Sequence, residues 1–182
     1  VAKLRETYPN VNISLHQGAP AQVAQMVMDE VAEIGIATES LSEYPELVTL
    51  PCYEWEHMLV IPKSHPLAGK VRITLEDLAA EPIITYHPSF TGRTRIDKAF
   101  AAKKLTPRIA LEAIDSDVIK TYVRLGLGVG IVAEMAVKDG LDDDLVARPA
   151  SQLFGKNVAR IAFKRSAYIR HFVYDFAALL SD

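Results

Sequence analysis

Three short runs of small and polar residues stand where helices are expected to begin. They are Ala19-Pro20-Ala21-Gln22, Thr91-Gly92-Arg93 and Asp115-Ser116-Asp117. The first turn of a helix leaves backbone N–H groups unpaired and carries the positive end of the helix dipole, so it can bind an anion. Small residues let a ligand approach the backbone, and Arg93 adds a charged donor. The three runs could therefore bind a small anion. The alternative for each run is that its residues only cap the helix.

The sequence offers little for catalysis or metal binding. No two of the five histidines are three or four residues apart, a G-x-S-x-G motif is absent, and Cys52 is the only cysteine. Helical metal-ligand pairs and a hydrolase nucleophile elbow are therefore missing. We predict no catalytic residue, no metal site and no cofactor. An enzyme on this scaffold would need an acid or base, for which Asp115 and His87 are the candidates.

A glycine-rich run, Gly126-Leu127-Gly128-Val129-Gly130, looks at first like a nucleotide-binding loop. Such a loop follows a strand and opens a helix, whereas these glycines follow a predicted helix and precede a predicted strand. The context favours a glycine helix stop and a tight turn. The run is therefore not assigned to a phosphate site.

Stretches with the two-residue period of strands alternate with stretches of helical period along the whole chain, which indicates an α/β fold. The predicted strands are 11–15, 34–38, 47–52, 57–61, 82–86, 108–113, 129–133, 145–148 and 158–163. Helices are predicted at 1–8, after 19, 74, 91 and 115, and over 169–180, where the apolar stripe is clearest. Neither a flexible linker nor a repeat is visible, so two lobes would have to be joined by strands.

Composition narrows the class of protein. The 182 residues are 49% hydrophobic and 24% charged, with a net charge of −3. These values are typical of a globular protein and exclude disordered, collagen-like and coiled-coil chains. The basic surface that nucleic-acid binding needs is missing. No apolar run is long enough to span a membrane, and no signal peptide is visible.

Several longer motifs resemble the effector domain of LysR-type transcriptional regulators, in particular their CysB-like and Cbl-like branch. The resemblance runs from Val1 to about Phe176, and residues 117–129 carry it most specifically. The other motifs lie at residues 16–22, 34–39, 50–55, 90–93 and 105–109.

The resemblance implies a fold of two Rossmann-like lobes of the periplasmic-binding-protein type II, joined by two crossover strands. Lobe I is expected over 1–82 and 162–182, and lobe II over 83–161. A winged helix-turn-helix that binds DNA is expected in the whole protein, outside this chain. The family's first effector-domain strand is likewise expected before Val1.

The resemblance also implies a function. Members of this branch regulate sulfur assimilation and cysteine biosynthesis, and sense N-acetylserine, O-acetylserine or adenosine phosphosulfate, with sulfate and thiosulfate as anions in the same cleft. In the family a T-P-T-Q turn lines that cleft, and here Ala19 and Ala21 replace both threonines. Each missing hydroxyl would weaken binding by roughly 0.5–1.5 kcal/mol. The candidate effector-binding residues are Ala19, Ala21, Gln22, Thr38, Thr85, Thr91, Gly92, Arg93, Asp115 and Thr121.

The partners implied by the resemblance are a small sulfur-pathway effector, DNA through the absent domain, and further copies of the chain. Effector domains of the family pair as dimers and whole proteins form tetramers, in the cytoplasm and without membrane contact. The alternative is a periplasmic-type solute-binding protein for a small anion, because it shares the two-lobed fold and an anion cleft.

Overall fold

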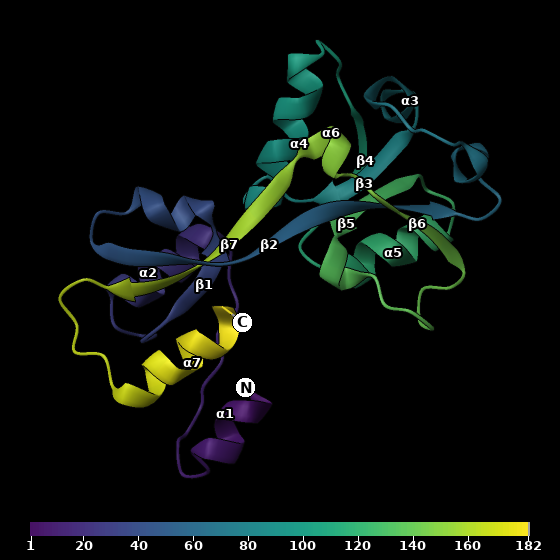
Figure 1. Cartoon of the computed structure of the whole chain (residues 1–182). Coiled ribbons are helices and arrows are strands. Elements are labelled where there is room, and N and C mark those ends of the chain that lie inside the picture. The colour runs from purple at the N-terminus through teal and green to yellow at the C-terminus, as the bar shows by residue number, and fades with distance from the viewer. Residues whose placement is uncertain (182) are drawn as a thin grey trace. The chain divides into compact units, whose positions relative to one another are not determined.

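The computed structural model describes residues 1–181, without the side chains of Thr91 and Ser181. The chain folds into two compact units that two strands join (Figure 1). Unit 1 holds Val1–Glu54 and the chain from Val158 onward, and unit 2 holds Trp55–Asn157. The first boundary thus falls before Trp55 rather than after Pro82.

The earlier boundary has a physical reason. Leu59, Ile61 and Leu78 are buried in one cluster with Ile83, a residue of unit 2. Residues 55–82 therefore share their core with the segment that follows them. Residues 55–82, which the sequence analysis expects in lobe I, thus lie in unit 2.

Unit 1 is a small sheet in the order β1-β7-β2, with helices on both faces. Ile161 and Phe163 of β7 pack with α7, whereas Ala162 between them packs with α2, because neighbouring strand residues point to opposite faces. β1 runs antiparallel to β7. The elements are α1 (Ala2–Thr7), α2 (Pro20–Met28), β1 (Gly35–Thr38), η1 (Glu39–Glu43), part of β2 (Leu47–Pro62), most of β7 (Lys156–Lys164) and α7 (His171–Ser181).

Two strand predictions in unit 1 need correction. Residues 11–15 alternate apolar and polar side chains, but the described chain has no strand there. An alternation of apolar and polar residues indicates which side chains face the protein interior. A strand also needs a neighbouring backbone with which it can form hydrogen bonds. The predicted runs 47–52 and 57–61 are one continuous strand, β2, which passes from unit 1 into unit 2.

Unit 2 is a sheet in the order β2-β5-β3-β4, with β6 also paired to β2. β3 is parallel to β4 and β5, while β5 and β6 are antiparallel to β2. The further elements are η2 (Pro66–Gly69), α3 (Leu75–Ala79), β3 (Pro82–Tyr86), α4 (Thr91–Ala102), β4 (Arg108–Ala113), α5 (Ser116–Arg124), β5 (Val129–Ala133), η3 (Glu134–Ala136), β6 (Leu145–Pro149) and α6 (Ser151–Phe154).

The two faces of this sheet have separate cores. α4 buries Ile96 and Phe100 on the face of Ile83, and α5 buries Ile119 and Val123 on the face of Ile84. α5 and α4 are therefore held firmly, and their first turns are positioned by the sheet. In the described chain, no helix combines the length and apolarity needed to cross a membrane.

Candidate functional site

Unit 2 brings two of the predicted helix starts to one edge of its sheet. β3 leads into α4 and β4 leads into α5, and since β3 and β4 are parallel, both helices begin beyond the same edge. In open α/β sheets ligands bind at this edge. One residue beyond β3, the N–H of His87 donates to the carbonyl of Ala113 at 2.9 Å, so the backbones of the two strands stay paired up to this edge.

Tyr86, at the end of β3, ties this edge together. Its hydroxyl lies 2.6 Å from Oγ of Ser116 on α5 and accepts a 2.9 Å hydrogen bond from the N–H of Ala133 on β5. Burial raises the pKa of the Tyr86 phenol above its ordinary value. Sequence reasoning missed Tyr86 as a site residue; its place at a strand end beside two helix starts is the signal that was available.

Arg93 holds α4 to the sheet. Its side chain is buried, Nε donates to Asp97 at 2.8 Å, and Nη1 donates to the carbonyl of Tyr86 at 2.9 Å and to Glu112 at 2.7 Å. Burial disfavours the charge, but the two carboxylates hold the pKa of the guanidinium above its ordinary value. The structure thus shows Arg93 occupied by internal partners.

Replacing Arg93 by alanine is expected to lower the free energy of unfolding by about 2–3 kcal/mol, because charge-assisted hydrogen bonds and a partner for the Tyr86 carbonyl are lost. Urea denaturation measures this. Arg72→Ala is the matched control, since Arg72 is exposed, and should change stability by no more than about 0.5 kcal/mol. Equal effects of the two variants would contradict the role given to Arg93.

Gly92, in the first turn of α4, rests on aromatic side chains. A Cβ atom at this position would lie 2.9 Å from Nε2 of His57 and 3.0 Å from Cη2 of Trp55. The close approach of the backbone requires glycine. The predicted contact through the Thr91 side chain lies outside the described residues.

The other three candidates of unit 2 differ in how far their side chains are exposed to solvent. Thr85 is fully buried and donates its hydroxyl to the carbonyl of Ile131 at 3.2 Å. Asp115 is exposed and caps α5 by accepting the Asp117 N–H at 2.6 Å. Thr121 is exposed, and its hydroxyl donates to the carbonyl of Asp117 at 2.7 Å. It lies further along α5 and away from the edge at which the helix begins.

Thr121 lines a cavity of about 460 Å³ whose remaining walls are almost all charged. Lys120 and Asp142 meet there at 2.9 Å, with both side chains about 5% exposed or less, and Arg124 joins Asp142 at 2.8 Å. Sequence reasoning did not find this ion-pair group. Residues 120 and 142 are far apart in sequence and no local pattern links them.

In unit 1 the candidates Ala19, Ala21 and Gln22 lie at the start of α2. Gly35 at the beginning of β1 lies against Val23 and Val27 of α2, and Thr38 is the last residue of β1. Oε1 of Gln22 accepts the N–H of Ala19 at 2.8 Å. The exposed Ala21 and Gln22 have no acceptor for their own N–H groups within the described chain.

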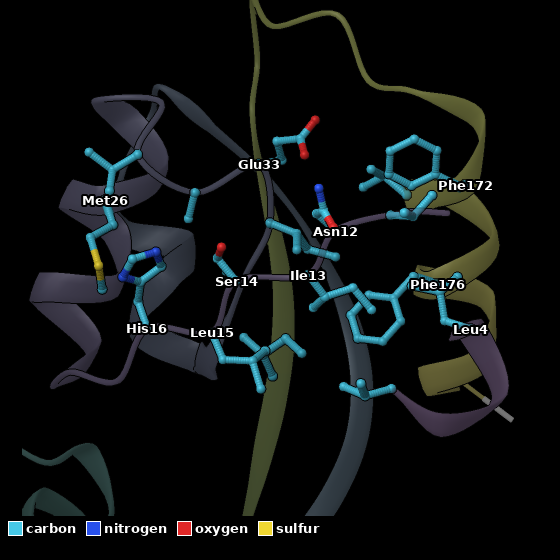
Figure 2. Close-up of a pocket in the computed structure, with 18 of the residues that line it drawn as sticks. Leu4, Asn12, Ile13, Ser14, Leu15, His16, Met26, Glu33, Phe172 and Phe176 are labelled. Atoms are coloured by element: carbon cyan, nitrogen blue, oxygen red, sulfur yellow. The ribbon is translucent and has the colours of Figure 1, made fainter. Parts of the chain in front are cut away.

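A second cavity, of about 430 Å³, lies within unit 1 (Figure 2). Apolar side chains such as Ile13, Leu15 and Phe176 dominate its lining, and none of the candidate residues contributes to it. An anion would lose its hydration there without gaining paired charges, which is unfavourable. The cavity is therefore not the predicted anion site.

The described residues do not group three His, Cys, Asp or Glu side chains as a metal ion would require. The fold and the helix starts thus describe a two-unit α/β domain suited to binding a small ligand. The family model of the LysR substrate binding domain matches residues 1–182, and the chain belongs to this family. Its fold is the periplasmic-binding-protein type II-like fold of LysR effector domains.

The relatives place the chain in one branch of the family. It is 50% identical to the regulator CysB of Burkholderia cenocepacia, over all of this chain and 58% of that protein. It is 43% identical to the regulator Cbl of Escherichia coli, over 98% of this chain and 57% of that protein. The chain is thus a CysB- and Cbl-like effector-binding domain, and it spans a little under three fifths of these relatives.

Solved structures agree. The crystal structure of the cofactor-binding domain of the Cbl regulator superposes with a TM-score of 0.94 at 43% identity, covering 99% of this chain and 79% of that one. The effector-binding domain of QuiR in complex with shikimate reaches 0.86 at 19% identity, which shows the shared fold alone. These relatives are transcriptional regulators and not enzymes, as the sequence predicted for this chain.

Proposed function

We propose that this domain senses a small anionic metabolite for a regulator of sulfur assimilation and cysteine biosynthesis. The effector binds at the start of α2 and is N-acetylserine, O-acetylserine, adenosine phosphosulfate or sulfate. The observation that carries the proposal is the start of α2, where the exposed Ala21 and Gln22 have unpaired N–H groups in the described chain. Such groups bind anions without any side-chain hydroxyl.

The remaining candidates have different roles in this proposal, some at the helix starts and some in the interior of unit 2. Thr38, Gly92 and Asp115 line or shape the helix starts, together with Ala19 and Thr91, and Thr121 contributes its exposed hydroxyl. Thr85 and Arg93 support the site from inside unit 2, since their polar atoms already have internal partners. The ligand acts by favouring one arrangement of the domain over others.

A thermal-shift titration tests the proposal with N-acetylserine, O-acetylserine, adenosine phosphosulfate, sulfate and thiosulfate. A ligand present at 100 times its Kd should stabilise the domain by about 2.7 kcal/mol. Ala21→Asp is expected to abolish the shift, because a carboxylate suits a helix start but repels an anion. Gln152→Asp, in the first turn of α6, adds the same charge elsewhere and should leave the shift intact. No shift with any of the five compounds would refute the sulfur effector.

Thr121→Val is expected to weaken effector binding by about 2- to 12-fold, which corresponds to a lost hydrogen bond of roughly 0.5–1.5 kcal/mol. Thr7→Val is the matched control, since the exposed Thr7 hydroxyl also donates to the carbonyl four residues earlier, that of Lys3. Isothermal titration calorimetry measures both. Full affinity in Thr121→Val would remove this residue from the site.

For the whole protein, we propose DNA binding through an N-terminal winged helix-turn-helix, a cytoplasmic location, and assembly as a homo-oligomer with paired effector domains and a tetrameric whole protein. The support is the kinship with CysB and Cbl regulators, which are longer than this chain. The net charge of −3 of this chain is compatible with DNA binding by the whole protein, because the proposal places the basic surface on the N-terminal DNA-binding domain. These two relatives do not support the periplasmic solute-binding alternative.

A further inference from the structure

The apolar cavity of unit 1 is a slot between two extended segments of the chain (Figure 2). Residues 11–16 line one of its sides, and residues 31–36, which lead into β1, line another. α2 and α7 pack on opposite faces of the sheet, and both contribute apolar side chains to the lining. These side chains are Val23 and Met26 of α2, and Phe172, Val173 and Phe176 of α7. The slot thus has the surroundings of a central strand, with backbone on two sides and a helix on each face.

Both extended segments present backbone groups without a partner. Residues 12–16 make no backbone hydrogen bond within the described chain. β1 pairs with β7 along one edge and is the outermost strand of the sheet that the described residues form, so its other edge is open. Unpaired N–H and C=O groups along a strand edge are a template for a further strand.

The positions of α1 and α2 indicate where a strand that precedes α1 would lie. Parallel strands joined through a helix form right-handed crossovers in almost all proteins, and two such crossovers on opposite faces of a sheet run in opposite directions across it. α1 lies on the α7 side, since the ring of Tyr8 at its end is 6.1 Å from that of Phe172 and the Tyr8 hydroxyl donates to Asp175. α2 lies on the other face. A strand before α1 would therefore lie on the same side of residues 11–15 as β1, which is the side of the slot.

The slot is also within reach of such a strand. Val1 itself lines it, so any residue joined to Val1 from upstream starts at the rim. A tethered segment meets a neighbouring site at a high effective concentration, which a separate molecule does not. The CysB and Cbl regulators to which the chain is related are longer than it. Apolar side chains on both faces of the slot suit a strand that is apolar on both of its own faces.

We propose that the segment preceding Val1 in the whole protein enters this slot as a strand of about five residues. The strand is apolar on both faces and pairs with residues 11–15 on one side and with β1 on the other. The inference rests on the proposed function in one respect only, that the whole protein continues upstream of Val1. It accounts for the strand-like alternation of residues 11–15, which have no pairing partner in the described chain.

Hydrogen exchange tests the proposal on three proteins: residues 1–182, the same chain extended upstream by about 15 residues of its natural sequence, and the whole protein. The amides of residues 12–16 are expected to exchange at least about tenfold more slowly in both longer proteins, because they become part of a buried ladder. Residues 83–85 of β3 are buried in unit 2 and serve as the control. They should exchange at the same rate in all three proteins.

Ile13→Asp gives a second measurement, because Ile13 lines the slot. In residues 1–182 the new carboxylate reaches water, whereas in the extended chain the docked strand buries it. The variant should therefore lower the unfolding temperature of the extended chain by at least about 5 °C more than that of residues 1–182. Val48→Asp is the matched control, since Val48 of β2 is partly exposed and does not line the slot. Its effect should be equal in the two chains.

Three outcomes overturn the inference. Residues 12–16 could exchange equally fast in the extended chain and in residues 1–182. Slower exchange in the whole protein alone would assign the slot to the DNA-binding domain, and slower exchange that depends on protein concentration would assign it to a second copy of the chain. No effector takes part in these measurements, so their result does not depend on whether the domain binds a sulfur metabolite.

Discussion

Asp142→Ala is expected to lower the free energy of unfolding by about 3–5 kcal/mol, because it removes the buried carboxylate that pairs with Lys120. Nζ of Lys120 would keep the carbonyl of Ala136 at 2.7 Å and the exposed Asp117 at 3.1 Å. Arg124 would keep Asp144. Denaturation in urea at pH 7 measures the loss.

The charge pair also makes a prediction about acid. Burial raises the pKa of Asp142, but Lys120, the N–H of Lys138 and Arg124 outweigh it and hold the pKa at about 2, below its ordinary 3.8. Since the pKa is depressed in the folded chain, the stabilisation is complete above pH 3.8 and is lost as the pH falls toward 2. The difference in stability between wild type and Asp142→Ala should shrink over this range.

Two further variants separate the ion pair from general damage. Asp139→Ala removes an exposed acid in the same loop and should cost less than about 0.5 kcal/mol. Lys120→Met should cost much less in the Asp142→Ala background than in the wild type, because contacting residues are not additive. Additive losses would show that Lys120 and Asp142 stabilise the chain independently.

Gly128→Ala is expected to cost about 3 kcal/mol or more, or to prevent folding. A Cβ there would lie 2.1 Å from the carbonyl oxygen of Pro82 and 2.7 Å from its carbon. These atoms belong to the backbone at the start of β3, which is paired with β5 from Ile83 onward. They cannot rotate away as a side chain can.

Two other glycines give a scale for this result. Gly126 has a φ of 77° with open space around its Cβ position, so Gly126→Ala should cost roughly 1–2 kcal/mol from the backbone alone. Gly69 has neither a positive φ nor a neighbour within 4 Å, and Gly69→Ala should be close to neutral. Thermal unfolding should show the largest loss of stability for Gly128→Ala, a smaller loss for Gly126→Ala and the smallest for Gly69→Ala. A similar loss for all three would contradict the steric argument.

Most of the fold was within reach of the sequence. The period of apolar residues predicted the helices. Thr74, after which a helix was predicted, forms a capping box in which the Asp77 carboxylate accepts the Thr74 N–H at 2.9 Å. Gly126 ends α5 as predicted, with the N–H of Leu127 bonded to the carbonyl of Tyr122 at 3.1 Å. These features depend on neighbours within a few residues, so local pattern is enough to reveal them.

The candidate site could be predicted from the sequence less completely than the fold. The helix starts were named correctly as elements, but Arg93 turned out to be occupied by internal partners and the Thr85 hydroxyl to be buried. A residue type shows which bonds a side chain can make. Which partner it meets depends on segments far away in the chain.

Local periodicity, capping and motif thus settled the fold class, the helix starts and the family of this chain. Tertiary packing settled where the units divide, why Gly128 must be glycine, and that Lys120 meets Asp142 across 22 residues. The His57–Asn157 contact, across 100 residues, belongs to the same group. Burial and charge pairing are properties of groups brought together in space, and sequence spacing carries no record of those meetings.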